Sequence, residues 1–297
     1  MTKVAVIGLG NMGGPMAGNL AKKGYDVAGF DLVKANVDAA VARGVKAAAS
    51  AADAAKGAAV IITMLPAGKD TIAVYEKSGI LEAADKGAVL VDCSTIDVAS
   101  ARKAHELAAA KGLLSLDSPV SGGVGGAEAA TLTLMIGGSK AAFDKAKPVL
   151  EAVSKKQVHC GDAGAGQAAK ICNNMILGIS MIGVAEAFVL AEKLGLSHQA
   201  LYDVASTASG QCWSLTSYCP VPGPVPASPA NNDYKPGFAS ALMMKDLKLA
   251  QEAAAQAGAT TPLGSAAAQL YSMHNAWGEG GTDFSGIIHL IRGKSGK

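Results

Sequence analysis

Four residues with polar or minimal side chains recur at helical spacing in an otherwise apolar stretch: Gln167, Lys170, Asn174 and Gly178. At 100° per residue they fall within an arc of about 80° on one helix face. That face offers an amine that can take up a proton, an amide that can orient a small molecule, and one position without a side chain to obstruct approach. Such a combination suits proton transfer to or from a bound substrate.

The chemistry of Lys170 depends on whether its amine is buried. Partial burial lowers the pKa of a lysine because the charged form loses hydration, and a second cation such as Lys245 would lower it further. A lysine poised nearer neutrality can accept a proton from an alcohol and return it to an aldehyde. The alternative is a solvated lysine at a helix start, with Asn173 and Asn174 as capping residues. Spacing alone leaves both interpretations open.

A glycine-rich turn near the N-terminus could bind a dinucleotide. Residues 8–13 read GLGNMG, after a short apolar run and before a helical pattern. In that context GxGxxG is typical of a dinucleotide site, where the glycines permit a tight turn, close approach of a pyrophosphate, and close packing of strand and helix. The alternative is a glycine-rich turn without a ligand. The residues expected to contact the cofactor here are Gly8, Gly10, Asn11, Met12 and Gly13.

An acidic residue at the end of the second strand-like run indicates which dinucleotide is bound. A carboxylate at Asp31 would accept hydrogen bonds from the adenosine ribose hydroxyls and repel a 2′-phosphate. An NADP enzyme would favour a nearby arginine, whereas the next residues are Leu32, Val33 and Lys34. The pattern favours NAD, although Lys34 blurs it slightly.

Two further strand-like runs end in TMLP at 63–66 and DCST at 92–95. In an open α/β sheet, ligands bind beyond the carboxyl ends of the strands. We therefore expect both ends to line the cofactor site, through Met64, Leu65, Pro66 and Thr95. Ordinary strand-exit turns are the alternative. A third stretch, DSPVSGGVGG at 117–126, exposes several backbone N–H groups and could bind a carboxylate without a charged side chain; its alternative is a flexible turn.

Strand-like and helix-like segments alternate up to about residue 160. Strands are expected at 4–8, 27–30, 59–65, 88–93, 113–116, 131–136 and 157–160, with helices such as 12–23 and 99–111 between them. Almost continuously apolar strands predict an α/β fold with a Rossmann-type, doubly wound, mostly parallel sheet. Later segments predict only helices, at 166–194, 198–208, 239–257, 262–275 and 283–291. We predict a domain at 1–162 and an all-α domain at 163–297, joined by a long interdomain helix.

Residues 219–236 interrupt the helical part with six of the chain's eleven prolines. Such a segment cannot be a helix or a central strand. Long loops in compact domains are usually functional, so a mobile lid, a fixed wall of a site and a stiff surface excursion all stay open.

Composition excludes several classes of protein. The chain is 50% hydrophobic with a net charge of +2 and no basic run, so nothing indicates nucleic acid or an acidic membrane surface. Its cysteines form no CxxC pair and its histidines no HxxxH cluster, which indicates free thiols in a reducing compartment and no metal site. The N-terminus does not resemble a signal peptide, and Glu186 within the apolar segment 175–191 favours a buried helix over a membrane span. We expect a cytoplasmic protein.

Taken together, these stretches resemble the β-hydroxyacid dehydrogenase family. The matching motifs are GLGNMGGPMAGNL, TMLP, DCSTI, DSPVSGGVGGAEAATLTLMIGG, GAGQAAKICNN and KDLKLA, in the family's order between residues 8 and 250. CWS at 212–214 and YCPVPG at 218–223 narrow the resemblance to the 3-hydroxyisobutyrate dehydrogenase branch. The family fold is a Rossmann domain followed by an all-α domain that associates through the long helix, so a homodimer or homotetramer is implied.

The resemblance also implies a role for each matching residue. Lys170 would be the general base or acid, and Asn174 would hold the substrate beside it. The residues implied to bind the substrate carboxylate are Ser121, Gly122 and Gly123. Those implied to close over or contact the cofactor are Leu65, Pro66, Thr95 and Lys245. Those implied to form the far wall of the substrate site are Trp213, Tyr218 and Asp246.

The implied reaction is the NAD-dependent oxidation of (S)-3-hydroxyisobutyrate to methylmalonate semialdehyde, a step of valine catabolism. A dehydrogenase or reductase of another short 3-hydroxy acid stays open, with L-serine, 3-hydroxypropionate and tartronate semialdehyde as examples, because telling a methyl from an amino or hydroxyl group depends on pocket detail. A phosphorylated sugar acid is disfavoured because the sequence has no arginine cluster. An alternative of another class is a non-catalytic dinucleotide-binding relative, although relatives of that sort have replaced the lysine that is present here at 170.

Overall fold

The computed structural model describes residues 1–293. The chain forms two compact units, Met1–Lys170 and Ile171–Lys297, and the division falls inside one long helix, α9 (Ala165–Lys193). The expected domain boundary at 162/163 stays a prediction.

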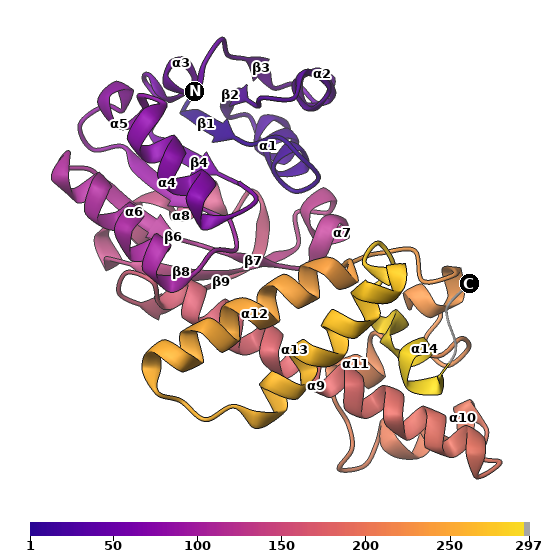
Figure 1. Ribbon diagram of the computed structural model, residues 1–297. Coiled ribbons are helices and arrows are strands. Elements are labelled where there is room, and N and C mark those ends of the chain that lie inside the picture. Colours follow the sequence, from indigo (N-terminus) through magenta and orange to yellow (C-terminus); the bar gives the residue numbers. More distant parts are fainter. Residues whose placement is uncertain (294–297) are drawn as a thin grey trace. The chain divides into compact units, whose positions relative to one another are not determined.

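The first unit is built on a nine-stranded sheet (Figure 1). The strands are β1 Lys3–Ile7, β2 Asp26–Phe30, β3 Lys46–Ala47, β4 Val60–Thr63, β5 Val89–Asp92, β6 Leu114–Asp117, β7 Val120–Ser121, β8 Leu132–Gly138 and β9 Ser154–Gly161. Their order is β3-β2-β1-β4-β5-β6-β8-β7, with β9 also paired to β8. β1 to β6 run parallel, β8 is antiparallel to β6 and β7, and β9 is parallel to β8. The predicted mostly parallel, Rossmann-like sheet is confirmed.

Helices cover both faces of this sheet (Figure 1). They are α1 Gly13–Lys22, α2 Lys34–Val41, α3 Ala51–Ala55, α4 Gly68–Lys77, α5 Ile80–Ala83, α6 Val98–Ala110, α7 Gly123–Glu128 and α8 Lys140–Leu150. Alternate residues of a strand point to opposite faces. In β1, Val4 and Val6 therefore join a core with residues of α1 and α8, whereas Ala5 and Ile7 join a second core with residues of α3 to α6.

The sheet also contains two strands that the sequence pattern did not predict, β3 and β7. Each has two residues, which is too short to produce a recognisable alternation of apolar and polar side chains. β7 matters for the site because Val120 and Ser121 pair with Leu134 and Thr133 of β8. The segment expected to be only a loop is therefore anchored to the sheet.

The second unit is helical, as predicted. It contains the rest of α9, α10 His198–Ala205, α11 Trp213–Thr216, α12 Ser240–Ala257, α13 Pro262–His274, α14 Ile287–Arg292 and the short turns η1 Pro229–Asn232, η2 Asn275–Glu279 and η3 Phe284–Gly286. Its core gathers buried side chains that include Phe188, Met243, Tyr271 and Phe284. Within residues 1–293, α9 is the one helix long and apolar enough to cross a membrane, with a mean hydropathy of 1.8. A buried core helix passes the same test, and 44% of that window is buried.

Candidate active site

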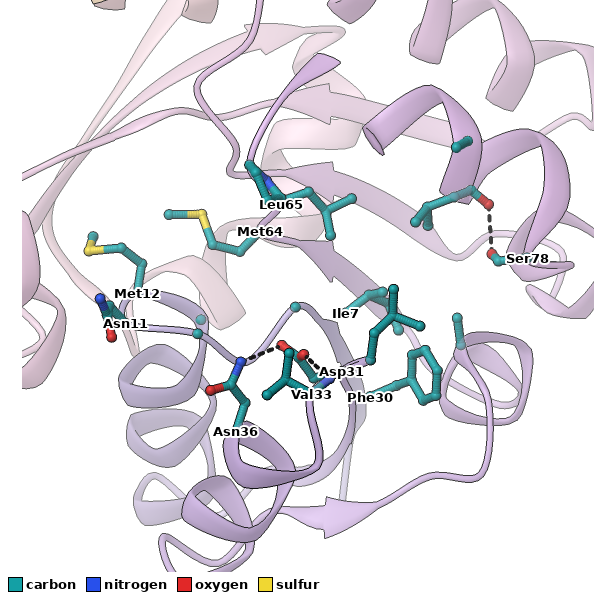
Figure 2. A pocket seen from close by; sticks show the side chains of 18 of the residues that line it. Ile7, Asn11, Met12, Phe30, Asp31, Val33, Asn36, Met64, Leu65 and Ser78 are labelled. Carbon is teal, nitrogen blue, oxygen red and sulfur yellow. Dashed lines mark hydrogen bonds between the residues drawn. The ribbon is translucent and has the colours of Figure 1, made fainter. Parts of the chain in front are cut away.

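A cavity of about 640 Å³ lies at the carboxyl ends of β1, β2 and β4. β2 and β4 flank β1 on opposite sides, and this is the switch point at which open α/β sheets bind ligands. Figure 2 shows Met64 and Leu65 on one side of the cavity, facing Asp31 and Asn36 on the other. Of the residues expected to bind the cofactor, those that line this cavity are Gly8, Gly10, Asn11, Met12, Gly13, Asp31, Met64, Leu65 and Pro66.

The three glycines of the GxGxxG turn are required for different reasons. Gly8 has a φ of +93°, and a Cβ there would lie 2.2 Å from the carbonyl oxygen of Met64. A Cβ at Gly13 would lie 1.9 Å from the carbonyl oxygen of Gly8, so these two glycines are needed for the turn and for strand–helix packing. A Cβ at Gly10 would meet no protein atom within 4 Å. The fold itself does not demand a glycine at this position, whereas a pyrophosphate lying against the backbone would, so the residues present fit a dinucleotide.

Asp31 is fixed at the end of β2 by three donors. Its carboxylate accepts a hydrogen bond from the N–H of Leu9 at 2.7 Å. It also accepts from the N–H of Val33 at 2.7 Å and from the side-chain amide of Asn36 at 3.2 Å (Figure 2). A carboxylate has about four acceptor sites, so roughly one is left for a ribose hydroxyl. Lys34, which blurred the choice between NAD and NADP, forms an exposed ion pair with Asp38 at 2.6 Å. The ammonium of Lys34 is therefore paired with a carboxylate of the same helix, α2.

A buried carboxylate supports the cofactor turn at 64–66. The N–H of Leu65 donates to the hydroxyl of Ser94 at 2.8 Å, and that hydroxyl donates to Asp92 at 2.6 Å. Asp92 also accepts from the hydroxyl of Thr63 at 2.7 Å. Burial raises the pKa of Asp92, opposed by these hydrogen bonds. Thr95, which directly follows Ser94, is half-buried but does not line the cavity.

Lys170 is buried in the first unit, with 6% of its surface exposed. Its amine donates to the carbonyl oxygen of Val120 at 2.9 Å. The interpretation as a solvated helix-start lysine is therefore wrong. The bond attaches the amine to the residue that directly precedes Ser121, Gly122 and Gly123, of which Ser121 and Gly123 are half-buried and Gly122 is exposed.

The first turn of α9 is held by a carboxylate from the neighbouring strand end. Asp117, the last residue of β6, accepts from the N–H groups of Gly164 at 2.8 Å and Gln167 at 2.9 Å. His105 bonds the same carboxylate at 3.0 Å and the hydroxyl of Ser115 at 2.7 Å. The sequence analysis did not identify these contacts of His105, because a bond between distant segments leaves no periodic signal.

Asn174 belongs to the second unit and is 2% exposed. Its amide donates to the carboxylate of Asp246 at 2.5 Å and accepts from the side chain of Asn173 at 3.0 Å. The alternative role of Asn174 as a capping residue is wrong, because it lies within α9. The expected role of Gly178 is also wrong: a Cβ there would lie 3.1 Å from Leu247, so the glycine makes room for the packing of α9 against α12.

The expected far-wall residues also lie in the second unit. The rings of Trp213 and Tyr218 are stacked with centroids 4.9 Å apart, and Trp213 is 53% exposed. The hydroxyl of Tyr218 donates to the buried carboxylate of Asp283 at 2.8 Å. Asp246 is buried in α12, and Lys245 beside it is half-buried. Lys245 also belongs to the second unit.

The proline-rich segment 219–236 is tied to itself and to the core. Cys219 and Val221 are fully buried, and the hydroxyl of Tyr234 donates to the carbonyl oxygen of Pro220 at 2.7 Å. The side chain of Asn231 accepts from the N–H of Gly223 at 2.9 Å and donates to the carbonyl oxygen of residue 225 at 2.8 Å. These contacts favour a fixed segment over a mobile lid, and a fixed wall and a stiff surface excursion both stay open as interpretations.

Comparisons with known proteins agree with this geometry. Residues 3–161 match the model of the NAD binding domain of 6-phosphogluconate dehydrogenase, and residues 164–291 match that of the NAD-binding domain of NADP-dependent 3-hydroxyisobutyrate dehydrogenase. The chain is 52% identical to a probable 3-hydroxyisobutyrate dehydrogenase of Mycobacterium tuberculosis over 99% of both chains. It is 47% identical to the NAD-dependent L-serine dehydrogenase of Pseudomonas aeruginosa over 98% of both.

A solved structure of Mycobacterium tuberculosis 3-hydroxyisobutyrate dehydrogenase with L-serine superimposes with a TM-score of 0.95. That protein shares 53% sequence identity, and the match covers 98% of this chain and 99% of the other. These matches confirm the sequence resemblance and the NAD cofactor. The alternative of a non-catalytic relative is not supported, because named dehydrogenases are 50% and 44% identical to almost the whole chain. The chain belongs to the 3-hydroxyisobutyrate dehydrogenase family of NAD-dependent oxidoreductases.

Proposed function

We propose that the protein oxidises (S)-3-hydroxyisobutyrate to methylmalonate semialdehyde, the valine-catabolic reaction. NAD, when bound, supplies the hydride acceptor: the primary alcohol loses a hydride from its carbon and a proton from its oxygen. The observation that carries this proposal is the buried amine of Lys170, which is bonded to the carbonyl oxygen of Val120. The chain is also 52% identical to a probable 3-hydroxyisobutyrate dehydrogenase over 99% of its length.

In this proposal Lys170 takes the hydroxyl proton. To act as a base, the amine must be in its neutral form when the alcohol binds. Its bond to Val120 uses one of the donors of the amine and fixes its direction. In the reverse direction the protonated amine returns the proton to the aldehyde oxygen.

Backbone groups and a fixed amide would hold the substrate. We assign the carboxylate to the N–H groups and hydroxyl at Ser121, Gly122 and Gly123, where no side-chain cation is needed. Asn174 lies one helical turn after Lys170 in α9, with its amide oriented by Asp246. Trp213 and Tyr218 would supply an apolar wall for the methyl group, and Thr95 and Lys245 would close over the nicotinamide.

L-serine is a second candidate substrate. It has the same hydroxymethyl and carboxylate groups, with an ammonium in place of the methyl group. One relative is named an L-serine dehydrogenase, and one similar solved structure contains L-serine. Measuring kcat/KM for both acids and 3-hydroxypropionate with NAD and with NADP tests the proposal. Tartronate semialdehyde, which is already an aldehyde, is measured in the reverse direction with NADH and NADPH. The proposal fails if L-serine exceeds (S)-3-hydroxyisobutyrate.

We also propose a cytoplasmic homo-oligomer with a structural boundary near 162/163. The side chains of Ile176 and Leu190 in α9 are 66% and 59% exposed, and a second copy could cover them. Sedimentation equilibrium distinguishes a dimer from a tetramer, and a monomer at micromolar concentration would contradict the proposal.

A further inference from the structure

The side-chain amide of Gln167 joins α9 to the end of β5. Gln167 is fully buried. Its Nε2 donates to the carbonyl oxygen of Ser94 at 2.7 Å, and its Oε1 accepts from the N–H of Ile96 at 3.1 Å. Both bonds connect residues more than 70 positions apart in sequence, and both lie within the first unit.

Ser94 is therefore held from two sides. Its hydroxyl supports the N–H of Leu65 in the turn that lines the cofactor cavity, and its carbonyl oxygen accepts from Gln167. Gln167 precedes Lys170 by three residues, which puts both side chains on the same side of α9. A continuous chain of hydrogen bonds thus runs from the cofactor turn through one strand end to the helical turn that carries the amine.

We propose that Gln167 is a positioning residue that sets where the Lys170 amine stands relative to the cofactor turn. This rests on the proposed role of Lys170 as the proton acceptor. Asp117 and Val120 hold the same turn by other bonds, so the turn stays folded without the amide but loses its direct link to Ser94. Enzymatic reactions lose rate steeply when a catalytic group, here the proposed proton acceptor, is displaced by about 1 Å.

Gln167→Met tests the proposal because methionine has nearly the same length and no polar atom. With the acid that the wild type oxidises fastest, kcat should fall roughly 10- to 100-fold. The dissociation constant of NAD should stay within about twofold, since the bond from Leu65 to Ser94 remains. The primary isotope effect on kcat, measured with substrate deuterated at the carbinol carbon, should rise because the chemical step becomes slower.

Two variants separate positioning from stability. Ser94→Ala removes the link to Leu65 but keeps the carbonyl oxygen that Gln167 uses, so NAD affinity should fall more than kcat. Gln157→Met is the matched control. It removes a half-buried hydrogen bond from the side-chain amide of Gln157 to the hydroxyl of Ser154 on β9, and kcat should be unchanged. If Gln167→Met lowers only the melting temperature and leaves kcat and the isotope effect unchanged, the proposal is overturned.

A double-mutant cycle with Lys170→Met tests whether Gln167 acts through Lys170. If Gln167 acts through Lys170, the double variant should be no slower than Lys170→Met alone. Effects that multiply would show that Gln167 acts independently and overturn the proposal. Wild-type turnover by Lys170→Met would instead overturn the proposed base, so the two failures are distinguishable.

Discussion

The amine of Lys170 and the carbonyl oxygen of Val120 lie 2.9 Å apart, joining the second turn of α9 to the two-residue strand β7. Because β7 pairs with β8, the position of the amine is set by the sheet. The glycine-rich residues that follow Val120 start from the same anchored backbone. A lysine and a glycine-rich segment are thus brought together from parts of the chain 50 residues apart in sequence.

Gly10→Ala should weaken NAD binding without weakening the fold. No protein atom lies within 4 Å of the added Cβ, so the free energy of unfolding should be unchanged or higher by up to about 1 kcal/mol. The methyl group would occupy space that a pyrophosphate needs, and we expect the dissociation constant of NAD to rise at least about tenfold. Isothermal titration and chemical denaturation measure the two quantities.

Gly8→Ala is the matched comparison. Its φ of +93° and the 2.2 Å approach to the carbonyl of Met64 predict a loss of stability of about 3 kcal/mol. If both substitutions destabilise the fold equally, the account is contradicted, because it holds that the fold requires Gly8 and only the ligand requires Gly10.

Asp31→Ser should shift the cofactor preference toward NADP. The substitution removes an acceptor for the ribose hydroxyls and the charge that repels a 2′-phosphate, so the kcat/KM ratio of NADP to NAD should rise roughly 10- to 100-fold. Lys34→Ala is the control, because an exposed pair with Asp38 contributes only about 0–1 kcal/mol. A preference unchanged by Asp31→Ser would show that another residue selects NAD.

Stability should fall on mild acidification because of a buried histidine in the second unit. Burial lowers the pKa of His274, opposed by the charge of Glu279. The folded state therefore prefers the neutral imidazole, and this contribution is complete above the unfolded pKa of about 6.5 and is lost as the pH falls toward the folded pKa. His289, which is packed on Tyr234, shifts in the same direction.

Melting temperatures between pH 5 and 8 check this prediction. We expect the wild type to lose stability below about pH 6.5 and His274→Gln to lose less. An identical slope in both proteins would show that His274 does not contribute.

Much of the fold could be predicted from the sequence because it rests on local signals. Apolar strands, the GLGNMG turn and the long apolar helix each carry a recognisable period or spacing, and the structure places them within a few residues of the expected bounds. β3 and β7 could not be found, since two residues carry no period. The hydrogen bonds from Lys170 to Val120 and from Gln167 to Ser94 could not be predicted either, because a side chain that bonds a distant backbone group does not change the local sequence pattern.

For Gly178 the predicted helix face is correct, but the predicted reason for the glycine is wrong. Its position on the same helix face as Lys170 and Asn174 suggested open space for a substrate. The nearby atoms belong to Leu247 and Met243 of α12, so the absent side chain serves helix packing. Helical spacing identifies which residues share a face, but it does not identify what covers that face.

The most direct test of the central claim is the rate of NADH formation in a single turnover by Lys170→Met, at saturating NAD and with the acid that the wild type prefers. If the buried amine takes the proton, this rate should fall by about 10²- to 10⁴-fold while the dissociation constant of NAD changes less than about twofold. NADH formation at the wild-type rate would contradict the account.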